Sequence, residues 1–102
     1  MKHTKSMIYK PTEESRELFL YATNDGELYH QRITPIIENL KKKYNRGTYD
    51  SKKAVDLWYY AATDASDRYY RDFAYKFDVT ARYTAAVEME RYYMDEITYK
   101  ED

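Results

Sequence analysis

One acidic and histidine pair comes closest to a catalytic or metal-binding motif in this sequence. Glu27 and His30 have the Glu-x-x-His spacing that places two metal ligands on one helix face in di-iron bundles. That chemistry needs the motif twice, with two further Glu on other helices. Here it occurs once, and the second histidine, His3, lies near the start of the chain. The pattern therefore predicts a surface pair three residues apart on a helix, and no metal site.

Other catalytic patterns are missing. The sequence has no cysteine and shows neither a Ser-His-Asp set nor a glycine-rich phosphate loop. Glu90 is the odd residue on the apolar face of a predicted helix, and a buried carboxylate can be catalytic. Pairing with Arg32 or Arg82, or with tyrosine hydroxyls, is the commoner reason for such a carboxylate. We therefore expect a protein that is not an enzyme and that needs no cofactor.

Tyrosine is the unusual component of the composition, with 14 residues among 102. Residues 67–73 read DRYYRDF, and residues 90–94 partly repeat this as ERYYM. On a helical projection, Tyr69, Tyr83 and Tyr93 fall on inward faces and are predicted to be core. Other tyrosines fall off those faces, where rigid rings and arginine favour protein interfaces, unless neighbouring helices cover them. The predicted partner-binding residues are Tyr59, Tyr60, Tyr70, Arg71 and Tyr92.

Charge is balanced over the whole chain, with 17 Lys and Arg against 18 Asp and Glu. This argues against a simple polybasic binder and excludes neither a protein nor a nucleic-acid partner. Residues 41–53 are locally basic, and lysines at a helix start could hold a phosphate or an acidic partner. An ordinary solvated turn is the alternative. The predicted basic patch comprises Lys41, Lys42, Lys43, Arg46, Lys52 and Lys53.

These residues would be positioned by helices, because breakers are rare and apolar residues recur at helical spacing. The predicted fold class is all-α, a small antiparallel bundle of about four helices. A first short helix follows Thr12, and a second spans about 27–44. Pro35 would kink that second helix, although two helices with a cap at Thr34 remain an alternative. Gly47 would end the segment.

A long third helix is predicted from about 51 to 75, capped by Asp50, and a fourth from Asp78 or Thr80 to about Thr98. Residues 1–10 lack periodicity and would form an N-terminal arm, disordered unless residues 7–9 pack on the body. Residues 11–102 would form a single helical domain. The inward faces of the third and fourth helices are expected at Ala54, Trp58, Ala61, Ala62, Ala65, Tyr69 and Phe73, and at Val79, Tyr83, Ala86, Tyr93, Met94 and Ile97.

Part of the chain resembles a known group of proteins. The features lie between residues 24 and 73 and read N-D, L-Y, P-I, N-L, G-T-Y-D and K-A-x-x-L-W in order. This pattern resembles small helical proteins encoded by tailed bacteriophages and related mobile elements. That group has no assigned activity, so it supplies no functional residues. The resemblance implies a phage-like origin and action in the cytoplasm of a bacterial host.

Small phage proteins without enzyme motifs often act by binding host machinery. We therefore expect a non-enzymatic protein that binds a host protein complex, with inhibition of a bacterial defence system, as by anti-CRISPR proteins, as one such role. The alternative is an accessory nucleic-acid binder that uses the basic patch and stacking tyrosines. A homo-oligomer that buries the tyrosine flank is a third possibility. The sequence shows no signal peptide and no apolar run long enough to span a membrane, so no membrane partner is expected.

Overall fold

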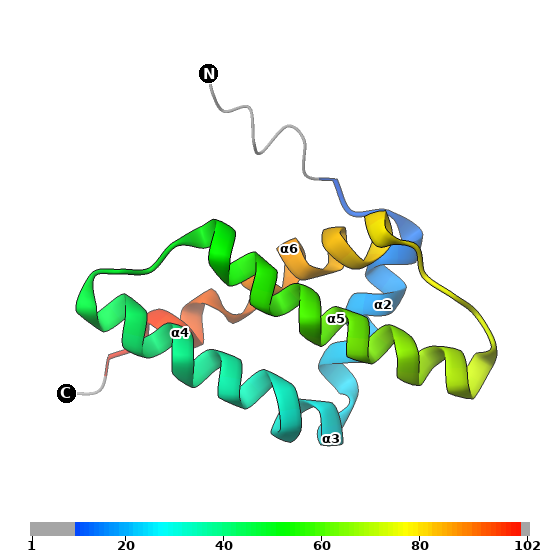
Figure 1. Cartoon of the computed structure of the whole chain (residues 1–102), viewed down its shortest axis with the longest axis horizontal. Helices are drawn as coiled ribbons and strands as arrows, with labels where there is room; N and C mark the ends of the chain where they lie inside the picture. Colours follow the sequence, from blue (N-terminus) through cyan, green and yellow to red (C-terminus); the bar gives the residue numbers. More distant parts are fainter. Residues whose placement is uncertain (1–9, 101–102) are drawn as a thin grey trace.

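A computed structural model describes residues 10–100 of the chain (Figure 1). These residues form the predicted all-α bundle. The elements are α2 (Glu13–Asn24), α3 (Gly26–Leu28), the π-helical segment η1 (Tyr29–Ile33), α4 (Thr34–Arg46), α5 (Ser51–Phe73) and α6 (Val79–Thr98). The predicted N-terminal arm lies outside the described residues, apart from Lys10.

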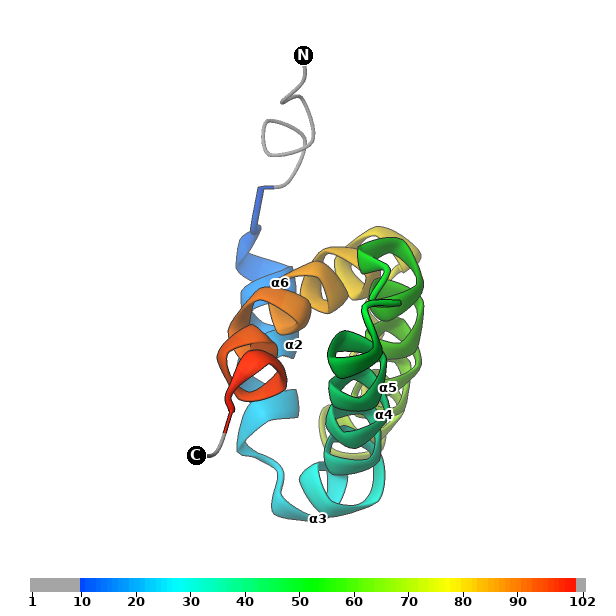
Figure 2. The ribbon, with the colours of Figure 1, turned by 90° about the vertical axis from the view of Figure 1, so that its left-hand side faces the viewer.

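The helices form two layers. Figure 2 shows α2 and α6 in one layer and α4 and α5 in the other. The long helices α5 and α6 run in opposite directions and form the main packing contact of the molecule. The Cα atoms span 44 × 36 × 18 Å, and the short dimension fits two helices packed roughly 10 Å apart.

Local chemistry sets the helix ends. Thr12 caps α2 in a reciprocal capping box with Ser15, and Asp25, Asp50 and Asp78 accept backbone N–H groups at the starts of α3, α5 and α6. Gly47 ends α4 in the left-handed conformation, with φ at 78°. The cap at Asp50, the end at Gly47 and, of the two alternatives for the last helix, the start at Asp78 agree with the sequence prediction.

Pro35 is accommodated within one continuous helical path. The backbone stays right-handed helical through η1 and Thr34, which rules out a cap at Thr34 because a cap residue is extended. In η1 the N–H of Thr34 donates to the carbonyl of Tyr29, five residues back. This wider turn accommodates a residue that lacks an N–H and whose ring would crowd an α-helical turn. The predicted distortion at Pro35 is therefore a π turn.

The core lies where α5 and α6 meet. Trp58 is fully buried and stacks on Tyr93, with ring centroids 5.0 Å apart and an interplanar angle of 18°. Buried alanines on both helices allow close approach: Ala54, Ala61, Ala62 and Ala65 on α5, and Ala81, Ala85 and Ala86 on α6. Leucine and isoleucine side chains from α2, α3, η1 and α4 complete the core.

Three residues predicted to be core are instead exposed. Phe73 is 62% exposed, Val79 61% and Tyr83 52%. On α5 the helix ends at Phe73, and Phe77 of the connecting segment is buried in its place, 5% exposed and 4.9 Å from the Tyr69 ring. On α6 the buried stripe runs through Ala81, Ala85, Met89, Tyr93 and Ile97, because small residues let α6 pack closely. Tyr69 and Met94 are only half-buried.

Candidate partner-binding surface

Several tyrosines join helices through their hydroxyl groups. The Tyr21 hydroxyl on α2 donates to Asp72 on α5, at 3.0 Å, and Tyr69 on α5 donates to Glu17 on α2, at 3.1 Å. Tyr75 donates to Glu14 in the same region. Burial, followed by the bonded carboxylate, raises the pKa of Tyr21 and Tyr69. The Tyr21 and Tyr69 rings are half-buried and hold α2 and α5 together, whereas the Tyr75 ring is exposed.

Of the partners that the sequence offers for Glu90, arginine or tyrosine, the structure shows a tyrosine. Glu90 accepts hydrogen bonds from the Tyr49 hydroxyl at 2.8 Å and from the Ser51 hydroxyl at 2.7 Å. Neither arginine considered for it takes this role, since Arg32 pairs with Asp64 and Arg82 bonds to neutral oxygens. Glu90 therefore ties α6 to the turn before α5.

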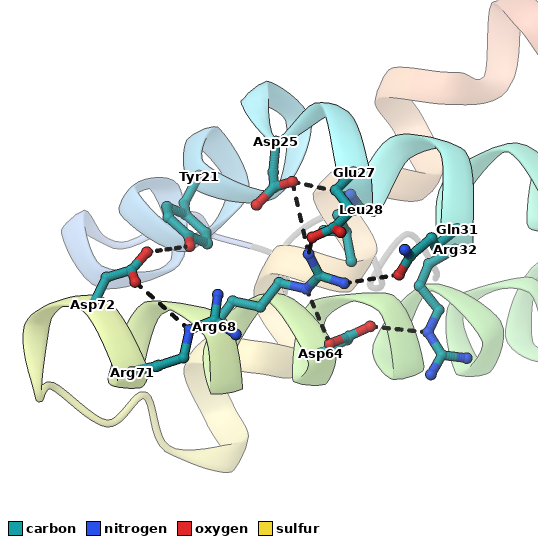
Figure 3. Close-up of polar contacts among 10 residues, drawn as sticks. All are labelled: Tyr21, Asp25, Glu27, Leu28, Gln31, Arg32, Asp64, Arg68, Arg71 and Asp72. Atoms are coloured by element: carbon teal, nitrogen blue, oxygen red, sulfur yellow. Dashed lines mark hydrogen bonds and ion pairs between the residues drawn. The ribbon is translucent and has the colours of Figure 1, made fainter.

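Arg68 of the DRYYRDF stretch is the centre of a polar cluster. Arg68 extends from α5 toward α3 and η1, where it bonds Glu27 at 2.7 Å, Gln31 at 3.0 Å and Asp64 of its own helix at 3.3 Å (Figure 3). Asp25, the α3 cap, lies 3.9 Å from the same guanidinium. Because Glu27 is engaged here, it acts as a fold contact. Within residues 10–100 no group of three acidic or histidine side chains could hold a metal ion.

The predicted partner-binding residues differ in exposure and in their contacts. Tyr60 and Tyr70 are exposed on α5. Tyr59 is half-buried beneath the Arg82 guanidinium, 5.6 Å from its ring centroid. Arg71 is exposed, with the adjacent Asp72 carboxylate at 3.7 Å. Tyr92 is exposed too, but its ring packs edge-on against Phe19 of α2, 5.3 Å away.

Exposed apolar side chains are concentrated, along the sequence, around the α5–α6 connection. Half of the large exposed apolar side chains in the described part of the chain fall between residues 70 and 83. We call this set the α5–α6 aromatic surface; it consists of Tyr70, Phe73, Tyr75, Val79 and Tyr83. Sequence reasoning identified Tyr70 and assigned three of the others to the core. The sequence does not show that α5 ends at Phe73 or that the buried stripe of α6 runs through Ala81 and Ala85.

Two hollows lie beside this surface and share Phe77 in their walls. The basic hollow, about 480 Å³, is lined by Ser66, Asp67, Tyr70, Lys76, Phe77 and Arg82. The acidic hollow, about 320 Å³, is lined by Glu13, Glu14, Glu17, Tyr69, Tyr75 and Phe77. The first has two positive side chains against one negative, and the second has three carboxylates and no basic side chain. The α5–α6 aromatic surface is therefore bordered by opposite charges.

The predicted basic patch lies at the other end of α5. Arg46, Lys42, Lys52 and Lys53 are exposed, and Lys41 lies over the Tyr99 ring at 5.9 Å. The start of α5 already holds two carboxylates, because Asp50 caps it and Glu90 bonds Ser51. The negative charge of these carboxylates disfavours a phosphate at the start of α5.

Comparison with protein-family models, with curated proteins and with solved structures gives no significant match to this chain. The resemblance to phage proteins therefore stays a prediction. Within residues 10–100, none of the helices combines the length and apolar character needed to cross a bilayer.

Proposed function

We propose that the protein is a non-enzymatic binding protein that engages a protein complex of its host through the α5–α6 aromatic surface. The observation that supports this is the concentration of exposed rings at Tyr70, Phe73, Tyr75 and Tyr83. Exposed rings gain contact area on binding at low cost in conformational entropy. Aromatic residues are also enriched at interfaces relative to the rest of a protein surface.

The phage resemblance favours a bacterial host as the source of the partner, and we propose a defence complex as its class. In that role the protein blocks the complex by occupying its surface, without chemistry of its own. A host with an active defence nuclease would then permit phage growth when it expresses the wild-type chain. Growth that stays restricted at full expression of the folded protein contradicts this role.

The test of binding is capture of host proteins by the tagged chain from nuclease-treated bacterial lysate. We expect a discrete complex with the wild type and its loss with Tyr70→Ala combined with Phe73→Ala. Tyr99→Ala is the matched control, because Tyr99 is similarly exposed but lies at the far end of α6. Circular dichroism confirms that each variant is folded.

Two outcomes would overturn the proposal. Equal capture by the double variant and by the wild type places the contact elsewhere. Capture that disappears on nuclease treatment moves the function to nucleic acid and to the basic patch defined by Lys41–Lys43, Arg46, Lys52 and Lys53. In that case affinity would fall steeply with salt.

A further inference from the structure

Among residues 10–100, the two cations of the basic hollow have no carboxylate partner. Within that range the Arg82 guanidinium donates to two neutral oxygens, the Asp78 carbonyl and the Thr63 hydroxyl, both at 3.4 Å. Lys76 lies over the Tyr70 ring, 5.5 Å from its centroid. Within the described chain neither forms an ion pair, whereas Arg16, Arg32 and Arg68 each pair with a carboxylate.

Aromatic rings hold both cations in place. The Tyr59 ring lies under Arg82 and the Tyr70 ring lies under Lys76, so cation–π attraction orients both charges before any ligand arrives. A planar carboxylate matches the fork of a guanidinium in a bidentate pair. Positions fixed in advance reduce the entropy lost on binding. At about 480 Å³, the hollow has room for an acidic side chain and an adjoining residue.

We propose that the basic hollow binds an aspartate or glutamate side chain of the protein partner, next to an apolar or aromatic residue that contacts Tyr70 and Phe77. This inference rests on the proposed function and specifies the chemistry of the segment that docks there. The docking segment of the partner therefore contains an acidic residue beside an apolar or aromatic one, and Arg82 and Lys76 bind its carboxylate.

Charge on the neighbouring residues favours a protein carboxylate over a nucleic-acid backbone. Asp67 lines the same hollow, and the three glutamates of the acidic hollow lie across Phe77 from it. A single carboxylate in the basic hollow meets two cations against the one carboxylate of Asp67, and the three glutamates lie in the other hollow. A strand of phosphates would bring several negative charges near four carboxylates, which repel it.

The test uses defined peptides and the full chain labelled with ¹⁵N. The probes are a blocked peptide with adjacent tyrosine and glutamate, its glutamine analogue, and single-stranded oligothymidine. We expect saturable shifts of the Ser66, Tyr70 and Lys76 amides with the glutamate peptide. Binding by Arg82→Gln should be about tenfold weaker, as for loss of one charge-assisted pair.

Two further variants complete the design. Lys76→Gln changes an exposed side chain, so it keeps the test valid if Arg82→Gln fails to fold; we expect a smaller loss of binding. Arg46→Gln is the matched control, since Arg46 is an exposed arginine on a different helix. Its peptide affinity should equal that of the wild type.

Equal binding of the glutamate and glutamine peptides overturns the inference, because the hollow then does not read charge. If only oligothymidine shifts the amides of the hollow, the hollow binds phosphate and the proposed carboxylate ligand is wrong. Host-complex capture separates this inference from the proposed function. If Arg82→Gln and Lys76→Gln capture the complex normally while Tyr70→Ala combined with Phe73→Ala loses it, the acidic ligand is rejected. The proposed binding through the α5–α6 aromatic surface then still stands.

Discussion

Replacing Arg68 with methionine should destabilise the protein by removing the polar contact between α5 and the α3–η1 segment. The Arg68 side chain is only 13% exposed, and its guanidinium bonds Glu27, Gln31 and Asp64 (Figure 3). Methionine keeps much of the apolar contact made by the arginine stem. The expected loss therefore reports the polar bonds.

The magnitude follows from the exposure of each partner. A hydrogen bond to a charged group contributes about 1.5–3 kcal/mol, and a pair at the surface about 0–1 kcal/mol. Glu27 is largely exposed, so the Glu27 bond counts at the lower end. Asp64 keeps Arg32 as a partner at 2.9 Å, so the change leaves no isolated charge there. We expect a decrease in the free energy of unfolding of about 2 kcal/mol, or about 8–16 °C in Tm for a chain of this size.

The assay is urea unfolding followed by the fluorescence of Trp58. It is the only tryptophan of the chain and is fully buried against Tyr93, so its emission reports loss of the core. Arg46→Met is the control, because Arg46 is exposed, and it should stay within about 0.5 kcal/mol of the wild type. Amide exchange should also quicken in η1 of the Arg68 variant. If Arg68→Met and Arg46→Met unfold at the same urea concentration, the contacts of Arg68 contribute nothing and the reasoning fails.

Two further predictions concern backbone conformation and alkaline pH. Gly47 and Ala74 both have left-handed backbone, with φ of 78° and 57°. Gly47→Ala should therefore lower the free energy of unfolding by about 1 kcal/mol, and Ala74→Gly should raise it by a similar amount. Changes of the same sign for both variants in calorimetry would contradict this. Burial, and then the bond to Glu90, raises the pKa of Tyr49 above its ordinary 10.0. The resulting stabilisation is complete below about pH 10 and is lost as pH rises above it. Tyr49→Phe should therefore lower the free energy of unfolding at neutral pH by about 1.5 kcal/mol. It should also reduce the loss of that free energy as pH rises above about 10. If urea unfolding at several pH values shows the same loss in the variant and the wild type, the bond does not have this role.

The candidate surface could be predicted only in part from the sequence. Tyr60 and Tyr70 were correctly placed outside the core face of α5, because the alanines and Trp58 define that face clearly. Phe73 and Tyr83 were misplaced, since both continue an apolar stripe at helical spacing. The pairing of Lys76 with Arg82 in one hollow was not visible, because Lys76 lies in the connection and Arg82 on the next helix.

The sequence by itself determined the helices and most of their ends, although not the end of α5 at Phe73. Asp25, Gly47, Asp50 and Asp78 act on backbone groups within a few residues, so their effect is readable from local order alone. Only the tertiary structure decided which of two adjacent stripes on α6 is buried, and that Phe77 rather than Phe73 closes the core. Helical periodicity shows that an apolar face exists, but the burial of a given side chain depends on where the neighbouring helices cross it.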